Sequence, residues 1–298
     1  MNYDSIHAFL TVAECGNISN AAQKLYISQS NLSARLQTLE KEIGHPLLIR
    51  SKGHRSIELT SHGEKFLALA RQMENIFLEV EQLRDEPERT PLTICTVDVN
   101  NTFTFVPFYQ AFTKKHPEIC LECHTAHSRE VFANIESGRY DLGFSGSLYA
   151  GMNIRTTLLF EEPMFLLTST ESPYYNGIHP SQLPAELEIY HRFSAEYELW
   201  HNARWPLHRC RMRISTGAMA KDYLDDAGTW IISCASTCLQ LSERYHFSVY
   251  SLSETPPARK CWMVESQIQK PSRQKAIAVF KEELAEFIRS NVNLDAKI

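Results

Sequence analysis

One stretch of the sequence, residues 61–84, constrains the fold more than any other. It contains no proline, and its apolar side chains recur at intervals of 3, 4, 3, 4 and 3 residues. This alternation is typical of a long helix with one apolar seam, which is buried when two such helices pair. A single amphipathic helix packed on its own domain is the alternative. The sequence therefore predicts a dimerising helix, with a seam formed by Phe66, Leu69, Met73, Ile76, Val80 and Leu83.

This helix divides the chain into a short N-terminal part and a long C-terminal part. The chain has 298 residues, of which 43% are hydrophobic, enough for about two domains with buried cores. Residues 85–91 (DEPERTP) contain prolines that end the helix and form a linker. We expect an N-terminal domain over residues 1–60, a linker helix and hinge over 61–90, and a C-terminal domain over 91–298. One lobe of that domain is expected from 91–160 with 266–298, and the other from 161–265.

Three short helices are predicted in residues 1–44. Apolar residues recur at helical spacing from Ile6, and Gly16 ends the first helix because it tolerates a left-handed backbone. Ser19 and Ser28 are placed to cap the second and third helices, since a serine hydroxyl accepts a hydrogen bond from a free backbone N–H. The third helix, which Gly44 ends, turns one apolar stripe toward a core, formed by Leu32, Leu36, Leu39 and Ile43.

A hairpin is predicted after these helices. Residues 45–60 (HPLLIRSKGHRSIELT) place two apolar runs on either side of a turn at 52–54, the arrangement of a wing. The net charge of the whole chain is -5, yet no acidic residue lies between Glu42 and Glu58. The hairpin therefore carries a local basic patch that suits contact with DNA phosphates, formed by Arg50, Lys52 and Arg55.

The polar face of the third helix is a second candidate for contact with DNA. Short polar and amide side chains reach base edges when a helix lies in the major groove. The alternative is a three-helix bundle whose polar face is only solvated. The residues that we assign to the DNA contact are Ser28, Gln29, Ser30, Asn31, Ser33 and Arg35.

The N-terminal sequence resembles the LysR type of transcriptional regulator. The matching positions, at the same spacing, are Phe9, Ala13, Gly16, Ala21, Ala22, Leu25, Ser28, Gln29, Leu32, Ser33, Leu39, Glu40, Gly44, Leu47, Leu48, Arg50, Leu59, Thr60 and Gly63. The resemblance implies a winged helix-turn-helix, in which the helix from Ser28 enters the major groove and the loop after Arg50 approaches the DNA backbone or minor groove. Two positions depart from the pattern. Ser30 stands where the family usually has proline, and Ala34 and Arg35 reverse the familiar order of a basic and a polar residue, so the base preference of relatives does not transfer.

Strands and helices alternate through the C-terminal two-thirds of the chain. Residues 92–97, 119–125, 141–145, 164–168, 188–193, 230–234 and 261–265 are predicted as strands. Helices are predicted over 102–115, with an interruption near Pro107, and over 128–137, 217–227 and 272–288. Such alternation predicts an α/β fold with parallel sheets. The order indicates two α/β lobes between which the chain crosses twice.

This C-terminal part resembles the effector-binding domain of LysR-type regulators, which is related in fold to periplasmic solute-binding proteins. The resemblance is carried by residues 116–118 (HPE), 138–143 (GRYDLG) and 161–163 (EEP). It implies an α/β fold class with an α-rich winged helix-turn-helix head and an effector domain of two Rossmann-like lobes. It also implies a small-molecule effector, a homodimer or homotetramer, and RNA polymerase as a further partner.

Loops at the carboxyl ends of the strands form the predicted effector site. In open α/β sheets, ligands bind beyond these ends, where loop amides and helix N-termini converge. By the family register, Asn100 lies where a hydroxylated effector-contacting residue is common. The alternative is that these residues only cap helices and turns, which Asn, Ser and Thr favour. The predicted effector contacts are Asn100, Asn101, Thr102, Ser128, Phe144, Ser194 and Thr216.

The cysteines raise two other interpretations. Cys120, Cys123 and His124 fit the spacing of c-type haem attachment, and with His127 they resemble a zinc site. On a strand, residues 120 and 123 point to opposite faces, and so do 123 and 124, so we expect no metal and no cofactor. A thiol-based, redox-responsive regulator is the other interpretation, and it depends on Cys210, Cys234 and Cys238.

The motifs of common enzyme active sites are absent from the sequence. It contains no Gly-x-Ser-x-Gly elbow, no phosphate-binding Gly-Lys-Ser/Thr loop and no dinucleotide glycine fingerprint, so we do not expect an enzyme. Residues 1–10 do not resemble a secretory signal and no apolar run approaches ~18 residues, which predicts a cytoplasmic protein without membrane contact. We expect a sequence-specific transcriptional regulator that binds a roughly palindromic double-stranded DNA operator and responds to an effector. A solute-binding or metabolic protein, whose N-terminal domain serves assembly, is the alternative.

Overall fold

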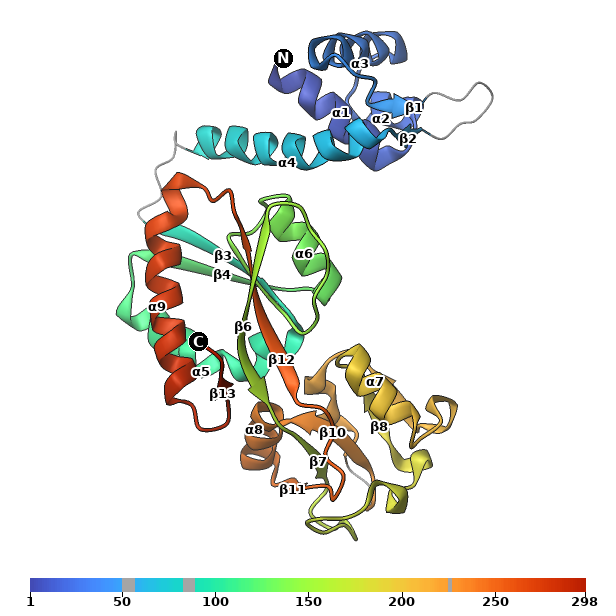
Figure 1. The fold of residues 1–298 in the computed structure, drawn as a ribbon, viewed down its shortest axis with the longest axis vertical. Helices are drawn as coiled ribbons and strands as arrows, with labels where there is room; N and C mark the ends of the chain where they lie inside the picture. The colour runs from blue at the N-terminus through green and yellow to red at the C-terminus, as the bar shows by residue number, and fades with distance from the viewer. Residues whose placement is uncertain (50–56, 83–88, 225–226) are drawn as a thin grey trace. The chain divides into compact units, whose positions relative to one another are not determined.

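The computed structural model describes residues 1–49, 57–82, 89–224 and 227–298. One compact unit lies within residues 1–88 and 136–139, and a second lies within 89–135 and 140–298 (Figure 1). Among the described residues, no helix has the length and apolar character needed to cross a membrane.

In the described part of the first unit, four helices and a small hairpin surround one core. Its elements are α1 (Tyr3–Cys15), α2 (Ile18–Lys24), α3 (Gln29–Ile43), β1 (Leu48–Ile49), β2 (Glu58–Leu59) and α4 (Ser61–Gln82). In the predicted stripe of the third helix, Leu32, Leu36 and Leu39 are fully buried, whereas Ile43 is only partly buried.

Local signals set the ends of the first three helices. Gly16 and Gly44 end α1 and α3 in the left-handed conformation, with φ of 67° and 82°. The Ser28 hydroxyl accepts a hydrogen bond from the backbone N–H of Asn31, which confirms the predicted cap of α3. The predicted cap of the second helix was wrong. Asn17, not Ser19, caps α2, because its side-chain oxygen accepts a hydrogen bond from the backbone N–H of Asn20, while Ser19 already lies inside the helix.

The predicted hairpin is present as the antiparallel pair of β1 and β2, in which Leu48 lies opposite Leu59. A carboxylate of α3 holds it in place. Glu40 Oε1 accepts hydrogen bonds from the backbone N–H groups of Leu47 and Leu48, at 2.8 and 3.1 Å. The backbone N–H of Thr60 donates to the Leu47 carbonyl at 3.0 Å. The hairpin is therefore tied both to α3 and to the residue that precedes α4.

The larger sheet of the second unit defines what we call the first lobe. Its strands lie in the order β13-β6-β12-β5-β3-β4. They are β3 (Thr90–Thr96), β4 (Ile119–Thr125), β5 (Leu142–Ser145), β6 (Ile154–Glu162), β12 (Arg259–Ser266) and β13 (Asp295–Ala296). β3 runs parallel to β4 and β5, but β12 runs antiparallel to β5 and β6. A parallel sheet was predicted, but the sheet is mixed. The reason is that the chain returns from the second lobe through β12. The sequence analysis had assigned this strand to the second lobe.

Helices cover both faces of this sheet (Figure 1). They are α5 (Val106–Lys115) and α9 (Gln274–Ser290) on one face and α6 (Ser128–Glu136) on the other. The helix predicted over 102–115 is divided in two, since a π-helical turn, η1 (Asn100–Thr104), precedes α5. Pro107 lies in the first turn of α5, where a missing N–H costs no hydrogen bond.

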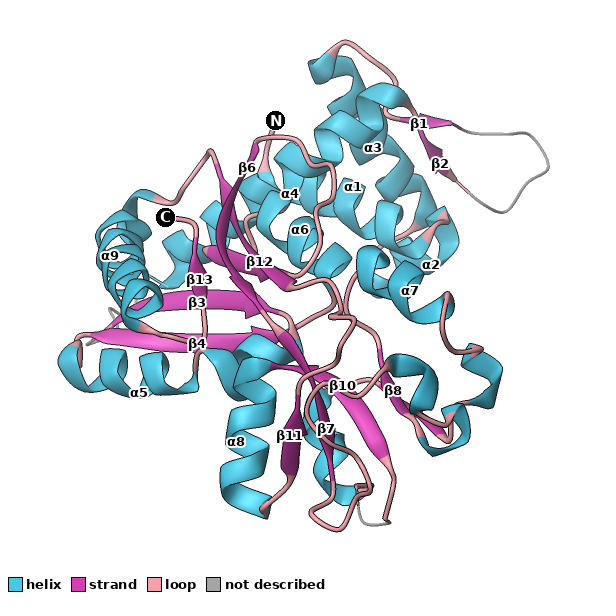
Figure 2. Ribbon diagram, turned by 60° about the horizontal axis from the view of Figure 1, so that its bottom comes forward, coloured by secondary structure: helices cyan, strands magenta, loops and turns pink. Residues whose placement is uncertain are grey.

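The second lobe contains the smaller sheets. β7 (Met164–Thr168) lies between β10 (Trp230–Cys234) and β11 (Ser248–Tyr250), and β8 (Ile189–His191) pairs in parallel with β9 (Met212–Ile214). Its described α-helices are α7 (Ala195–Asn202) and α8 (Ala235–Tyr245). In the described part of 217–227, where a helix was predicted, the structure has a 3-10 turn, η5 (Gly217–Asp222). Figure 2 shows β6 continuing into β7, so β6 and β12 are the two strands through which the chain passes between the lobes.

Candidate functional site

The start of α3 presents short polar side chains to solvent. Ser28, Gln29, Ser30 and Asn31 are all exposed, and Ser33 is partly buried. The hydroxyl oxygens of Ser28 and Ser30 lie 3.0 Å apart, and the Ser28 hydroxyl also caps the helix. This end of the helix therefore offers hydroxyl and amide groups that suit contact with base edges or phosphates.

Arg35 is linked to its neighbours on the same surface. Its Nε donates to Asn31 Oδ1 at 3.3 Å, and its Nη1 lies 3.5 Å from the Asp4 carboxylate. Tyr26, in the turn before α3, is 95% exposed and has a φ of 55°. The sequence analysis did not select Tyr26, because its position in a turn did not indicate that its side chain would be exposed to solvent.

The predicted basic patch of the wing is Arg50, Lys52 and Arg55. All three lie outside the described residues, so their assignment stays a prediction.

The predicted seam of α4 divides between two environments. Leu69, Ile76 and Val80 have 45%, 56% and 56% of their surface exposed. Phe66 is instead buried in the core of its own unit, and its ring lies 5.1 Å from that of Phe9. Met73 packs partly against the same core, and Leu83 lies outside the described residues.

Loops of the two lobes meet at the carboxyl ends of β3 and β9. Asp98, which follows β3, accepts a hydrogen bond from the backbone N–H of Gly217 in η5 at 3.1 Å. The Thr102 hydroxyl donates to the other oxygen of Asp98 at 2.9 Å. Thr216 precedes Gly217, so the structure brings the predicted residues Thr102 and Thr216 together. Asp98 links Thr102 to the residue after Thr216, and the sequence analysis placed Asp98 in the correct loop without selecting it.

Other predicted effector residues lie at neighbouring strand ends. The Ser128 hydroxyl accepts a hydrogen bond from the backbone N–H of Gly146 at 3.2 Å, which links the loops after β4 and β5. Asn101 donates to the Thr125 hydroxyl at 2.9 Å. Ser194 caps α7 in the second lobe, as its hydroxyl accepts from the backbone N–H of Tyr197.

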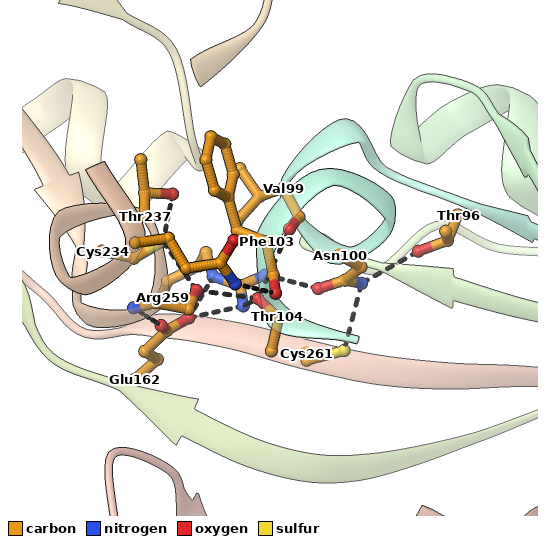
Figure 3. Close-up of polar contacts among 12 residues, drawn as sticks. Thr96, Val99, Asn100, Phe103, Thr104, Glu162, Cys234, Thr237, Arg259 and Cys261 are labelled. Carbon is orange, nitrogen blue, oxygen red and sulfur yellow. Dashed lines mark hydrogen bonds and ion pairs between the residues drawn. The ribbon is translucent and has the colours of Figure 1, made fainter. Parts of the chain in front are cut away.

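Asn100 and Phe144 do not line an open site. Both are fully buried, with Phe144 in the core of the first lobe. The Asn100 amide donates to Thr96 Oγ1 at 2.9 Å, and its oxygen accepts from Arg259 Nη1 at 2.9 Å (Figure 3). The prediction of these two side chains as effector contacts is corrected, because one is committed to internal hydrogen bonds and the other to apolar packing.

The partner of Asn100, Arg259, belongs to a buried ion pair between the lobes (Figure 3). Glu162 Oε2 accepts from Arg259 Nε at 2.8 Å and from its Nη2. Nη2 also donates to the Thr104 hydroxyl at 3.0 Å, and Glu162 Oε1 accepts from the backbone N–H of Ser236. Burial opposes the charge of Arg259, but the adjacent carboxylate of Glu162 more than compensates, so the pKa of Arg259 is raised. The network joins the ends of β6 and β12 to η1 and α8.

His191 lies at the end of β8, close to the contact between Asp98 and Gly217. A Cβ on Gly217 would lie 3.8 Å from His191 Cε1. Burial lowers the pKa of His191 to about 4, against the opposing effect of the Asp98 charge. The ring is therefore neutral at pH 7.

A surface pocket of about 440 Å³ borders the same contact. Thr102 and Phe103 of η1 line it together with Ala218 and Lys221 of η5 and Arg244 of α8. The Lys221 ammonium is bonded to Asp222, at 2.6 and 2.8 Å from its two carboxylate oxygens.

Two of the three cysteines of the redox interpretation, Cys234 and Cys238, lie in unreactive surroundings. Cys234 and Cys238 are buried, and burial raises the pKa of both thiols. A buried thiol with a raised pKa contains little thiolate, the reactive form. Cys210 is partly exposed, and Cys120 and Cys123 are exposed on β4. Within the described residues, no group of three or more His, Cys, Asp or Glu side chains could hold a metal ion.

Two family models match most of the chain. The model of the bacterial regulatory helix-turn-helix proteins of the lysR family matches residues 3–64. The model of the LysR substrate binding domain matches residues 85–287. Both matches confirm the resemblance and the fold class that the sequence analysis predicted.

Curated relatives match over part of their length. The chain is 29% identical over 179 residues to the probable cat1 operon transcriptional activator of Acinetobacter lwoffii, in an alignment that covers 58% of this chain and 57% of that protein. It is 28% identical over 178 residues to the Hca operon transcriptional activator HcaR of Escherichia coli, covering 58% of each. The chain therefore spans less than two-thirds of these relatives.

Solved structures match over nearly the whole chain. A full-length OxyR variant from Pseudomonas aeruginosa has a TM-score of 0.63 at 17% identity, covering 100% of this chain and 98% of that one. Full-length CbnR in complex with its target DNA has a TM-score of 0.60 at 20% identity, covering 96% and 99%. These likenesses show the fold. The two family models establish that the chain belongs to the lysR family of bacterial regulatory helix-turn-helix proteins and carries a LysR substrate binding domain.

Proposed function

We propose that the protein regulates transcription by binding a specific DNA sequence, and that a small molecule held between the two lobes modulates this binding. The observation that carries the proposal is the exposed start of α3, where Gln29, Ser30 and Asn31 face solvent within a helix-turn-helix of the lysR family. A helix that presents such side chains at its N-terminus suits the major groove.

The DNA contacts that we propose combine α3 with the wing. Gln29 reads a base, since an amide side chain can form two hydrogen bonds to adenine. The other residues position the helix on the backbone or contribute charge. The complete proposed set is Ser28, Gln29, Ser30, Asn31, Ser33, Arg35, Arg50, Lys52 and Arg55.

The effector site that we propose lies at the strand ends where the lobes meet. The contact between Asp98 and Gly217 and that between Ser128 and Gly146 support this location, since each joins loops that follow different strands. The residues that remain as proposed effector contacts are Asn101, Thr102, Ser128, Ser194 and Thr216.

The protein acts, in this proposal, as a homodimer or homotetramer in the cytoplasm, with RNA polymerase as a further partner. The exposed apolar side chains of α4 support self-association through that helix. Two copies of α3 then face two half-sites, and the operator is roughly palindromic. Regulation of this kind requires no catalytic step.

Substitution of Gln29 by alanine tests the proposed function. We expect Gln29→Ala to weaken binding to DNA from the protein's own promoter region by ~1–3 kcal/mol more than binding to random DNA, because a lost bidentate base contact reduces discrimination. Mobility shifts over a range of salt concentrations measure both affinities. Gln110→Ala, which changes an exposed glutamine of the second unit, should leave both unchanged. Equal losses on the two DNAs in Gln29→Ala would refute a base-reading role.

A further inference from the structure

Tyr26 lies in the turn between α2 and α3, and its side chain extends into solvent. Of its surface, 95% is exposed, although an aromatic ring contributes most to stability when it is buried. Among the described residues, its hydroxyl has no hydrogen-bond partner. The first unit therefore gains almost nothing from the ring or from the hydroxyl of Tyr26.

The backbone of Tyr26 is left-handed, with a φ of 55°. This conformation brings the Cβ of an L-residue too close to a carbonyl oxygen, so glycine is favoured there, and the turn of a helix-turn-helix often contains glycine. The turn is held by hydrogen bonds from the Tyr26 N–H to the Gln23 carbonyl, at 3.1 Å, and from the Ile27 N–H to the Ala22 carbonyl, at 3.0 Å. A strained residue that the fold does not need points to a role in function.

The residues on either side of Tyr26 direct its side chain away from the core. Leu25 and Ile27 both pack partly against the core of the first unit. Ser28, which caps α3, follows two residues after Tyr26, and two residues span at most about 7 Å. The side chain of Tyr26 therefore leaves the backbone close to the exposed polar start of α3.

We infer that Tyr26 is a DNA contact in addition to those of α3 and the wing, and that its hydroxyl donates a hydrogen bond to a phosphate. This inference rests on the proposed function, which places α3 in the major groove. The first helix of a helix-turn-helix crosses the DNA backbone, so the turn that joins the two helices lies beside the phosphates that border the groove. Tyrosine hydroxyls are among the groups that contact phosphates. No acidic residue lies between Glu14 and Glu40, so no carboxylate of this segment repels a phosphate.

A phosphate contact from a neutral hydroxyl differs measurably from other DNA contacts. It reads no base, so its loss lowers the affinity for every DNA sequence by the same factor. It neutralises no phosphate charge, so its loss leaves the salt dependence of binding unchanged. Loss of a base contact would instead reduce discrimination between sequences, and loss of a lysine or arginine contact would change the salt dependence.

Tyr26→Phe in the full chain removes only the hydroxyl. We expect the Kd to rise by about tenfold both for DNA from the protein's own promoter region and for random duplex DNA of the same length, because hydrogen bonds to charged groups are strong. The slope of log K against log salt should stay the same. Mobility shifts over a range of salt concentrations measure all three quantities. Tyr223→Phe, which changes an exposed tyrosine of the second unit, should leave both Kd values unchanged.

Tyr26→Gly separates a role in DNA binding from a role in folding. Glycine adopts the left-handed backbone without strain, so we expect the Tm of the first unit to rise by about 2–4 °C. The Kd for both DNAs should nevertheless rise at least as much as in Tyr26→Phe. Thermal unfolding of the full chain, monitored with a probe in the first unit, measures the Tm. A side chain that only supports the fold would lower the Tm when it is removed.

Four outcomes would overturn the inference. They are a Kd in Tyr26→Phe equal to that of wild type, a loss of affinity for promoter DNA alone, a Tm of Tyr26→Gly below that of wild type, and a change of mass by light scattering in Tyr26→Phe, which would place the tyrosine between chains. A wild-type protein that prefers promoter DNA while Tyr26→Phe binds it equally well contradicts this inference alone. A wild-type protein that binds both DNAs equally contradicts the proposed function instead.

Discussion

Gly63, in the first turn of α4, occupies a position with no room for a side chain. A Cβ there would overlap the carbonyl oxygen of Leu47 and would lie 3.3 Å from the Cβ of Leu59. That carbonyl is held in place because it accepts a hydrogen bond from the Thr60 N–H at 3.0 Å. The backbone of the hairpin therefore passes directly against the start of α4, and glycine permits the approach.

Gly63→Ala should consequently destabilise the first unit. We expect the free energy of unfolding to fall by about 1–3 kcal/mol, the usual cost of forcing atoms into a packed position. Urea unfolding of the full chain, monitored with a probe in the first unit, measures the change in the free energy of unfolding. Gly146→Ala, measured with a probe in the second unit, is the matched control, because the nearest atoms to its Cβ lie at 3.9 and 4.0 Å, an ordinary contact distance. Equal stability of the two variants would show that the hairpin moves aside at little cost.

The helix α4 has two apolar surfaces with different roles. Phe66 and Ala70 are buried against α1, so this surface holds the helix to its own unit. Leu69, Ile76 and Val80 are about half exposed, and Phe77 and Leu78 are 41% and 45% exposed. Contiguous exposed apolar side chains on a helix mark a surface of interaction. The seam that we propose for pairing therefore consists of the exposed residues and excludes Phe66.

Ile76→Glu should prevent the chains from pairing along α4. A carboxylate in the seam loses water without gaining a partner, which is costly. Size-exclusion chromatography with light scattering should report the mass of a single chain for the variant and a multiple of it for wild type. Arg71→Glu, which changes an exposed residue of the same helix, should keep the wild-type mass. If the Ile76→Glu variant elutes with the wild-type mass, the interface lies elsewhere.

At the scale of the whole molecule, the lobes are joined by a buried ion pair where the chain crosses between them. Glu162 ends β6 and Arg259 begins β12, and both side chains are at most 5% exposed. Through Asn100 and Ser236 the pair also bonds to η1 and to the start of α8. A charge in such a position is stable only while its partner and its hydrogen bonds are present.

Glu162→Gln should therefore reduce stability far more than loss of a surface pair. We expect the free energy of unfolding to fall by about 3–5 kcal/mol, because Arg259 is left as an uncompensated buried charge. Glu162→Gln combined with Arg259→Met should recover part of the loss. The exposed pair of Lys24 and Glu14 provides the control, and Lys24→Ala should leave the free energy of unfolding almost unchanged, because exposed ion pairs contribute little to stability. Denaturant unfolding of wild type and the three variants gives the free energies of unfolding. If Glu162→Gln lowers the free energy of unfolding as little as the control does, the ion pair does not stabilise the fold in this way.

The sequence by itself determined the features that depend on neighbouring residues. Gly16 and Gly44 end α1 and α3, Ser28 caps α3, and the periodicity over residues 61–84 predicted the long helix that the structure describes as far as Gln82. Local signals succeed there because a helix end or an apolar face depends on residues within one or two turns. The family motifs also predicted the fold class, because each motif identifies a whole segment rather than a single contact.

Only the tertiary structure decided what covers each face and which polar groups remain available. Periodicity placed Phe66 in the seam, but Phe66 is buried against α1. The family register placed Asn100 at the effector site, but its amide oxygen accepts a hydrogen bond from Arg259, which lies 159 residues away in the chain. Asp98 was not selected from the sequence because its contact lies with Gly217 of the other lobe. Contacts between distant parts of the chain depend on how the strands are ordered and where the lobes meet, and no pattern of nearby residues encodes that arrangement.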